Sequence, residues 1–315
     1  MKLSQLITEY VSLKQDMGMR FNSEASIFRS FLRSVADSDL TTVDPSSVVA
    51  FIAGKGPITA YWHLKYKVLA GLYRFAISRG YVDSSPLPTT VPKQPEPLRP
   101  YIYSTEELQR LLKATDMLEN PMSPLQATTF RTLLLTLYGT GLRIGEALAL
   151  TIADLSLADR LLLVRVSKFF KTRLVPMGPH LMDQLQAYLL KRRLLPHPLC
   201  EDSSLFSTRT GSALSYHRVR KIFSLLRKQA GVQRLDGATL APRIHDIRHT
   251  FAVHRLELWY REGADVQRLL PQLATYMGHV DVSETQRYLS MTPELLHEAS
   301  RRFENYALTR RVDHD

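Results

Sequence analysis

Four side chains near the C-terminus have types that suit phosphate chemistry. The stretch H-D-I-R-H-T-F-A-V-H places Arg248 three residues after His245, so on a helix the two share one face and can reach one target. Further on, Y-M-G-H-V-D-V-S-E-T-Q-R-Y-L contains His279 and Tyr288, nine residues apart. Two histidines, an arginine and a phenol that converge would form a phosphate-handling set with a tyrosine nucleophile.

The chain between His279 and Tyr288 must bend for these side chains to converge. On one unbroken helix, nine residues make about 2.5 turns, which would point the two side chains in opposite directions. Gly278 is typical of a helix end, and Ser283-x-x-Gln286 has the capping-box pattern of a helix start. The sequence therefore predicts one helix that ends near Met277 and another that begins near Ser283.

The charge balance favours a polyanionic partner. Lys and Arg number 41 against 30 Asp and Glu, which gives a formal net charge of +11. Such a surface can be merely solvated, but in a chain of this size it favours nucleic acid over an acidic small substrate. The 315 residues suit two domains, and 44% hydrophobic with 23% charged residues is ordinary for a soluble globular protein.

Signals for disulfides, export and membrane insertion are weak. The single cysteine, Cys200, cannot form an internal disulfide or a cysteine zinc site. The N-terminus M-K-L-S-Q-L-I-T-E-Y lacks the apolar core of a signal peptide, and no apolar run approaches the ~18 residues of a membrane span. A cytoplasmic protein with no membrane partner is expected.

Residues 1–84 are predicted to form a helical domain. Asp44-Pro45 is a start signal for a helix to about Ala53, and a longer helix follows the break at residues 54–57 and runs to about Arg79. The apolar stripe expected to face inward on the longer helix is Tyr61, Leu64, Val68, Leu72 and Phe75. Three cations of this helix are candidates for contact with a phosphate backbone: Lys65, Lys67 and Arg74. Exposed charges on a helix are, however, often only solvated.

Residues 85–103 are expected to link this domain to a second one, residues 104–315. Six prolines fall between residues 84 and 100, which forbids helix and favours an extended connector. The second domain opens with the capping box Ser104-x-x-Glu107. Its expected elements are helices at about 125–138, 179–193 and 216–230, a short helix that carries Arg143 and Glu146, strands at about 161–166 and 172–176, and further helices from His245 onward. The predicted fold class is mainly α with a small β-sheet (α+β).

Three motifs in this order resemble those of the tyrosine recombinase, or phage-integrase-like, family, which includes Xer recombinases. They are T-G-L-R-I-G-E (140–146), H-D-I-R-H-T-F-A (245–252) and G-H followed by a tyrosine nine residues after the histidine (278–288). The layout is similar as well: a helical core-DNA-binding domain, a linker and a mixed catalytic domain. The resemblance covers nearly the whole chain, most strongly about residues 104–300. One motif alone would be weak, but all three in order are specific.

The resemblance implies a role for each motif residue. Tyr288 would attack a DNA phosphodiester to give a 3′-phosphotyrosyl link and a free 5′-hydroxyl. Arg143 and Arg248 would hold the non-bridging oxygens, which suits the planar fork of a guanidinium group. His245 would assist proton transfer from the tyrosine, and His279 would donate a hydrogen bond to the phosphate.

A carboxylate and a lysine would complete the site. The resemblance implies that Glu146 orients Arg143 without touching the substrate; an ordinary surface carboxylate that pairs with Arg143 is the alternative. The leaving 5′-oxygen needs an acid, which in the family is a lysine between two strands. Lys168 and Lys171 both lie in the expected hairpin. Counting back from L-V-P favours Lys168, but Phe169-Phe170 replaces the usual glycine-rich turn, so the register stays open.

Neither a metal nor another cofactor is expected. His245-x3-His249 has the spacing of two zinc ligands on one helix face, but no third ligand stands at a fitting distance. No carboxylate cluster suits Mg²⁺, and covalent attachment would conserve the energy of the broken bond without ATP. His249 and His254 are therefore interpreted as packing or supporting residues.

The expected partners are double-stranded DNA and further copies of the chain. After Thr292-Pro293, an apolar helix face is predicted from Leu295, Leu296, Ala299 and Phe303. This helix can pack on its own domain, but the resemblance implies contact with a neighbouring protomer, in a dimer on one DNA site and a tetramer in the synapse. Accessory proteins or partner recombinases, and a bacterial, nucleoid-associated location, are further implications.

The predicted function is site-specific DNA recombination through a Holliday junction, of the integrase or transposase type found in mobile elements. Two alternatives use the same residues differently. A DNA-binding regulator would keep the fold without cutting, but none of the family's catalytic positions is substituted. A type IB-like topoisomerase or hairpin resolvase would make the same tyrosine attack without strand exchange.

Overall fold

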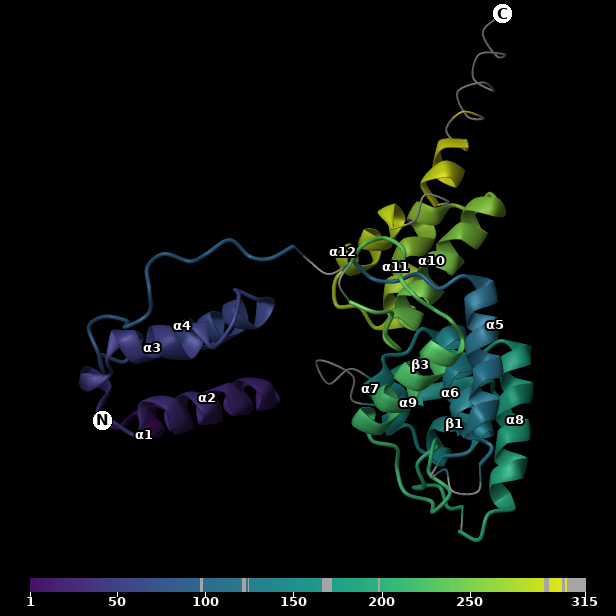
Figure 1. Cartoon of the computed structure of the whole chain (residues 1–315), viewed down its shortest axis with the longest axis horizontal. Coiled ribbons are helices and arrows are strands. Elements are labelled where there is room, and N and C mark those ends of the chain that lie inside the picture. Colours follow the sequence, from purple (N-terminus) through teal and green to yellow (C-terminus); the bar gives the residue numbers. More distant parts are fainter. Residues whose placement is uncertain are drawn as a thin grey trace, which may run out of the picture. The chain divides into compact units, whose positions relative to one another are not determined.

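The chain folds into two compact units, Met1–Leu98 and Arg99–Asp315 (Figure 1). The computed structural model describes residues 1–96, 99–120, 123, 125–165, 172–197, 199–238, 240–291, 295–301 and 304. Helices predominate in both units, and the sheet found among these residues lies in the second unit. The predicted fold class, mainly α with a small β-sheet, is confirmed.

The first unit is a bundle whose described residues form α1 (Leu3–Asp16), α2 (Asn22–Val35), the 3-10 turn η1 (Leu40–Thr42), α3 (Pro45–Ala53) and α4 (Ala60–Ser78). Helix α3 begins where predicted, because the Asp44 carboxylate accepts hydrogen bonds from the amides of Ser46 and Ser47 and Pro45 occupies the first helical position. Large apolar side chains from the helices, Phe28 and Phe31 among them, fill the core.

The inward face of α4 was predicted correctly in the later turns, where Val68 and Leu72 are buried and Phe75 packs against the core, but not at the start of the helix. Tyr61 is 53% exposed and Leu64 is 41% exposed, whereas Trp62 and Leu69 are buried. At the start of α4 the buried side chain is thus Trp62 and not Tyr61. The physical reason is size, because the indole of Trp62 removes more apolar surface from water than the phenol of Tyr61 does.

The prediction that Lys65 contacts a phosphate backbone is also corrected, because its side chain is buried. Its ammonium group donates to the carbonyl of Phe51 at the end of α3 and lies 4.9 Å from the centre of the Phe51 ring. Burial lowers the pKa of Lys65. Lys65 therefore stabilises the bundle, and only Lys67 and Arg74 of the three candidate cations are exposed.

Residues 85–96 contain no helix or strand, as their prolines require. The end of this segment is held on the second unit. Arg234 donates to the carbonyls of Arg99 and Pro100, and Tyr103 donates from its backbone amide to the hydroxyl of Thr250. Residues 99–103 are thus fixed to the second unit, while the role of residues 85–103 as a linker remains a prediction.

The described part of the second unit combines helices with one antiparallel sheet of strand order β1-β2-β3. The strands are β1 (Leu155–Ser156), β2 (Leu161–Val164) and β3 (Arg173–Pro176), and β2 and β3 pair in the register Leu161 to Pro176 and Val164 to Arg173. The helices are α5 (Thr105–Ala114), α6 (Ala127–Thr140), α7 (Ile144–Ala149), α8 (Pro179–Arg193), α9 (Tyr216–Gln229), α10 (Asp246–Arg261), α11 (Val266–Met277) and α12 (Ser283–Gln286), with 3-10 turns η2 (Thr115–Leu118), η3 (Ile152–Asp154) and η4 (Arg287–Ser290).

Helix α6 runs through the core of this unit and packs against α7, α8 and α10. It ends at Gly141, whose φ of 61° is left-handed. A Cβ atom at Gly141 would come within 2.4 Å of the Phe251 ring on α10, so glycine is needed for the close approach of the two helices. Figure 1 shows α10, α11 and α12 grouped at one end of the unit.

The predicted break between His279 and Tyr288 is confirmed. Helix α11 ends at Met277, Gly278 follows with a φ of 70°, and α12 begins at Ser283. The expected capping box at Ser283 is wrong, however. Val282 is the N-cap residue, and the amide of Ser283 donates instead to the side chain of Asp281.

The predicted C-terminal helix is present at residues 295–301. Leu295 is fully buried against α10 and α11, and Leu296 is 53% exposed. Phe303, which was expected on its apolar face, lies outside the described residues, as do the hairpin lysines Lys168 and Lys171.

Candidate active site

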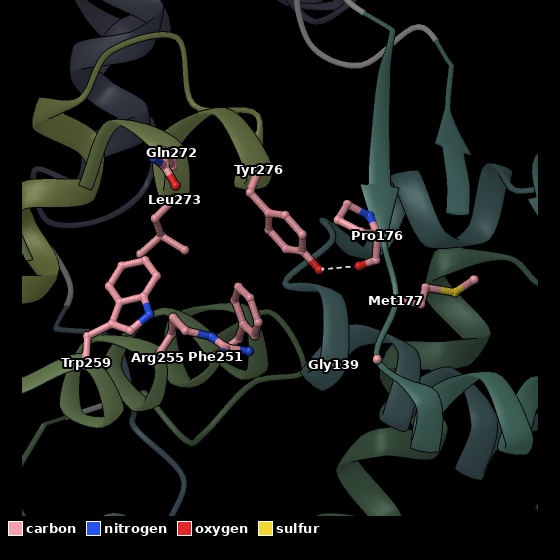
Figure 2. Close-up of a pocket in the computed structure, with 10 residues that line it drawn as sticks. Gly139, Pro176, Met177, Phe251, Arg255, Trp259, Gln272, Leu273 and Tyr276 are labelled. Atoms are coloured by element: carbon pink, nitrogen blue, oxygen red, sulfur yellow. Dashed lines mark hydrogen bonds between the residues drawn. The ribbon is translucent and has the colours of Figure 1, made fainter. Parts of the chain in front are cut away.

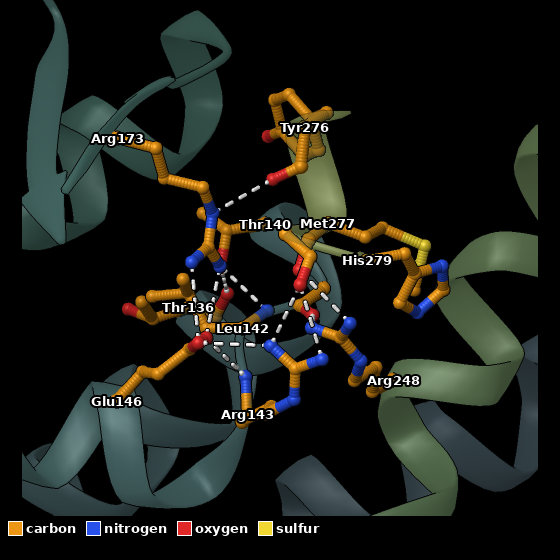
Figure 3. Close-up of polar contacts among 12 residues, drawn as sticks. Thr136, Thr140, Leu142, Arg143, Glu146, Arg173, Arg248, Tyr276, Met277 and His279 are labelled. Carbon is orange, nitrogen blue, oxygen red and sulfur yellow. Dashed lines mark hydrogen bonds and ion pairs between the residues drawn. The ribbon is translucent and has the colours of Figure 1, made fainter. Parts of the chain in front are cut away.

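Three arginines from different elements converge on the C-terminal end of α11 (Figure 3). Arg173 Nε donates to the Tyr276 carbonyl at 3.0 Å, Arg248 Nη2 to the Met277 carbonyl at 2.9 Å, and Arg143 Nη1 and Nη2 to the Gly278 carbonyl at 3.1 Å. The last carbonyls of a helix have no partner within it and carry the negative end of its dipole. The end of α11 therefore holds β3, α10 and the start of α7 together.

Glu146 on α7 joins two of these arginines. Its carboxylate accepts two hydrogen bonds from Arg173, at 3.1 and 2.9 Å, and one from Arg143 Nη1 at 3.1 Å. The side chain is only 8% exposed. Burial raises the pKa of Glu146, but the hydrogen bonds and charge of Arg173, with those of Arg143, outweigh burial and hold the pKa below its usual value. Glu146 is thus a buried anion within the cluster and not a surface carboxylate.

Arg173 is a residue that the sequence analysis missed. It opens a strand that was predicted correctly, but a basic residue at a strand start carries no local sign of a role. Its guanidinium also packs on Gly278, where a Cβ atom would approach Arg173 Nη1 to 2.7 Å. The glycine of the G-H motif is needed both for its left-handed backbone and for this contact.

Arg248 is almost completely buried, with 3% of its surface exposed. Besides the Met277 carbonyl, it reaches the carbonyl of Gly141 at 2.6 Å. Burial, with Arg143 beside it, lowers the pKa of Arg248 to about 10, which leaves it charged at neutral pH. A guanidinium carries five N–H donors, so these anchoring bonds leave donors of Arg143 and Arg248 for the oxygens of a phosphate.

His279 follows Gly278 and is held by Thr285 of α12. Its Nδ1 lies 2.6 Å from Thr285 Oγ1, and both side chains are buried. Burial, followed by the charges of Arg248 and Arg143, lowers the pKa of His279 to about 3, so the ring is neutral at neutral pH. With the threonine hydroxyl as donor to Nδ1, the ring hydrogen sits on Nε2, where it can be donated to a ligand.

Tyr288 lies in η4 and is 3% exposed. Its hydroxyl is 3.1 Å from Nδ1 of His249 on α10, and its ring stacks at 6.1 Å, centre to centre, on His279. Burial raises the pKa of Tyr288, against the opposing effect of Arg248. The phenol is therefore protonated at neutral pH.

A pocket of about 310 Å³ unites most of the predicted site. Its lining includes five predicted catalytic residues, Arg143, His245, Arg248, His279 and Tyr288, together with Pro100, His249, Glu284, Arg287 and Met291. His245 caps α10 and meets His249 edge to face, with ring centres 5.1 Å apart. Burial, with Arg248 beside it, lowers the pKa of His245.

His249 is the second residue whose place in the site the sequence analysis missed. It was interpreted as a packing or supporting residue, yet it makes the hydrogen bond to the tyrosine hydroxyl. Its spacing of four from His245 was a signal, since it puts both rings on one helix face. That spacing was weighed only as a zinc pattern. Among the described residues, no group of three or more His, Cys, Asp or Glu side chains is arranged to hold a metal ion.

A second, larger hollow of about 390 Å³ lies in the same unit, away from the predicted catalytic residues (Figure 2). It is lined by Gly139, Pro176, Met177, Gly178, Phe251, Arg255, Trp259, Gln272, Leu273 and Tyr276. Across it, the Tyr276 hydroxyl donates to the Pro176 carbonyl at 3.0 Å. This bond ties α11 to β3 a second time, next to the bond from Arg173.

The helices of the described chain include none that combines the length and the apolarity needed to cross a bilayer.

Comparison with known proteins gives consistent matches. Residues 103–294 match the model of the phage integrase family. A putative integrase/recombinase of Sinorhizobium fredii is 34% identical over 312 residues, 95% of this chain and 96% of that protein. Tyrosine recombinase XerC of Oceanobacillus iheyensis is 30% identical over 285 residues, 89% of this chain and 87% of that protein.

The fold also matches a solved structure, a lambda integrase tetramer bound to a Holliday junction. The match covers 91% of this chain and 77% of that one, with a TM-score of 0.64 and 17% identity.

Glu146→Gln should lower the free energy of unfolding of the second unit by about 3–5 kcal/mol, because it leaves buried guanidinium groups without their anion. Asp116→Asn is the matched control. Asp116 pairs with Arg131 at 2.8 Å, but its side chain is 62% exposed, so the loss should stay below about 1 kcal/mol. Denaturant unfolding at neutral pH measures both losses. Equal losses would contradict the role of Glu146 as a buried anchor.

The contribution of Glu146 should also depend on pH. Its pKa in the folded protein lies below the unfolded value of about 4.3, so its stabilising effect is present above that value and is lost as the pH falls through the folded pKa. Unfolding curves of the wild type and Glu146→Gln should differ fully at about pH 6 to 8 and should converge only once the pH falls below the folded pKa of Glu146.

Thr285→Val should let the His279 ring exchange tautomers, because valine keeps the shape of threonine but has no hydroxyl. Loss of a bond worth about 1 kcal/mol corresponds to a roughly fivefold shift in the tautomer ratio away from the Nε2–H form. Proton–nitrogen NMR correlations of the ring measure this ratio, and Thr285→Ser should keep the wild-type value. An unchanged ratio in Thr285→Val would refute the assignment.

Proposed function

The chain belongs to the phage integrase family and is a site-specific tyrosine recombinase, and we propose that Tyr288 is the nucleophile with which it cuts and rejoins DNA. The phenol oxygen would attack a DNA phosphodiester, giving a 3′-phosphotyrosyl link and a free 5′-hydroxyl. The observation that carries the proposal is that the buried Tyr288 hydroxyl lines one pocket with Arg143, Arg248 and His279.

Arg143 and Arg248 bind the non-bridging oxygens of the scissile phosphate in this proposal. Their guanidinium groups are already fixed by helix-end carbonyls and, for Arg143, by Glu146. Donors that are fixed before the reaction need no reorganisation as charge develops, and each is worth about 3–4 kcal/mol of barrier by analogy with oxyanion holes. His279 adds a neutral donor through Nε2, and His245, which lines the same pocket, would assist proton transfer from the tyrosine.

A lysine of the β2–β3 hairpin protonates the leaving 5′-oxygen. Lys168 is the favoured candidate and Lys171 the alternative. Arg173 supports this proposal, because it opens β3 directly after the hairpin and its guanidinium is bound to Glu146 and to α11. The strand that leads out of the hairpin is thereby anchored at the pocket.

Double-stranded DNA is the proposed partner, and both a core-DNA-binding domain of residues 1–84 and a catalytic domain of residues 104–315 would contact it. Lys67 and Arg74, exposed on one face of α4, supply phosphate contacts in the first. Because a net charge of +11 acts on a polyanion, binding should weaken steeply with salt. We further propose dimers on one site and a tetramer at a Holliday junction, as in the lambda integrase of similar fold.

The nucleophile is tested by trapping the covalent complex. The probe is a duplex recovered from a random-sequence pool by binding to this protein, with nicks introduced along one strand so that the short cleaved end diffuses away. Wild-type protein should form a covalent adduct, and Tyr288→Phe should form none. Tyr276→Phe is the matched control, because it removes a tyrosine hydroxyl that bonds Pro176 outside the catalytic pocket, and it should retain the adduct. An adduct in Tyr288→Phe would refute the proposal.

The acid is identified with a probe whose bridging 5′-oxygen at the cut site is replaced by sulfur. A thiolate leaves without protonation, because a thiol has a pKa of about 8.5, far below that of an alcohol. Removal of the true acid should slow cleavage of the oxygen probe about 10²- to 10⁴-fold and leave the sulfur probe nearly unaffected. Lys168→Ala should show this pattern and Lys171→Ala should not; the reverse result would assign the acid to Lys171.

A further inference from the structure

The hydroxyl of Tyr288 has a specific partner that the family resemblance does not supply. His249 Nδ1 lies 3.1 Å from the tyrosine oxygen, and the two ring centres are 5.6 Å apart. The two residues come from α10 and η4, elements that pack on each other. We propose that His249 is the catalytic residue that accepts the proton of Tyr288 during attack on the phosphate and returns it during religation.

This inference rests on the proposed role of Tyr288 as nucleophile, and the attack itself requires such an acceptor. As the tyrosine oxygen forms its bond to phosphorus, its O–H bond breaks and the proton moves to His249 Nδ1. The bond from phosphorus to the 5′-oxygen breaks, and that oxygen takes a proton from the hairpin lysine. In religation the 5′-hydroxyl attacks, the lysine recovers its proton, and the imidazolium of His249 returns a proton to the departing phenol.

His249 has the protonation state that an acceptor needs. Burial, followed by the effect of His245, lowers the pKa of His249 to about 4, so its ring is neutral at neutral pH. With the ring hydrogen on Nε2, Nδ1 presents a lone pair to the phenol. The phenol keeps its proton in the free enzyme, because burial raises the pKa of Tyr288. The resting pair is therefore neutral on both sides.

The bound phosphate would make His249 a stronger base. The charged and titratable groups that face His249 are His245, Asp246 and Arg248 on α10, Arg243 before it, and His279 and Tyr288 on the other side. An anionic phosphate held by Arg143 and Arg248 would offset the positive charge that disfavours an imidazolium here. Proton acceptance would thus become less unfavourable when DNA occupies the pocket.

The second histidine of the same helix provides a matched control. His254 Nδ1 lies 2.9 Å from the hydroxyl of Tyr138, so α10 carries two similar histidine–tyrosine pairs, and the pair of His254 does not line the catalytic pocket. His254→Asn should show how much the loss of one histidine–tyrosine hydrogen bond affects the fold when no catalytic residue is changed. His249→Asn keeps a polar atom near the position of Nδ1 but has no basic nitrogen.

The test measures single-turnover formation of the adduct with the nicked duplex. His249→Asn and His249→Ala should cleave about 10²- to 10⁴-fold more slowly than the wild type at neutral pH, the usual range for loss of a general base. His254→Asn should stay close to the wild-type rate. Circular dichroism and DNA affinity must match the wild type in all variants, so that a slow rate reports chemistry. Added imidazole should restore part of the rate in His249→Ala.

The pH dependence separates proton acceptance from mere positioning. Without a base, attack needs the phenolate, so the rate of His249→Ala should rise about tenfold per pH unit from neutral pH up to the phenol pKa, while the wild-type rate should rise much less. Wild-type rates in His249→Asn, or an unaltered pH profile in His249→Ala, would overturn the proposal. A steep profile in His245→Asn with a flat one in His249→Ala would overturn it in favour of His245. A wild-type protein without any Tyr288 adduct would instead refute the proposed function, and this inference with it.

Discussion

The C-terminal end of α11 is the interaction on which the candidate site depends. Its last carbonyls accept hydrogen bonds from Arg173, Arg248 and Arg143, which belong to three different elements. Guanidinium groups buried without partners would repel each other and destabilise the fold. Here a helix dipole, unpaired carbonyls and the carboxylate of Glu146 neutralise them in fixed positions. The same contacts that make the cluster stable therefore also fix Arg143 and Arg248 at the wall of the pocket.

In the free protein the pocket is cationic, and its histidines and tyrosine are neutral. The arginines are charged, whereas His249 and His279 are neutral and Tyr288 keeps its proton. The pocket is therefore cationic without containing a reactive phenolate. An anion that enters would satisfy the arginines and at the same time alter the proton affinity of its neighbours. In the proposed mechanism, the binding of DNA and the activation of Tyr288 would therefore be coupled electrostatically.

Features that depend on the spacing of residues along the chain could be predicted from the sequence. The break at Gly278, the strand at Arg173 and most helix ends follow from local backbone rules, and the motif residues of the pocket were found from their order. Contacts between distant segments were not accessible in the same way. Nothing near Arg173 in sequence reveals that its partners are Glu146 and the end of α11. Only the start of α4 was misjudged, because Tyr61 and Trp62 both fit an apolar stripe and the larger ring is the one that is buried.

Gly278 and Arg173 lie more than a hundred positions apart in the sequence, yet the Arg173 side chain packs directly against Gly278. The glycine has a left-handed backbone, and the guanidinium fills the space where any other residue would put its first side-chain carbon. A chain that replaced the glycine would have to move the Arg173 side chain and strain the turn before His279. Related chains can thus be sorted by whether they retain both, a criterion that can flag degenerate copies even when every motif residue of the pocket is still present.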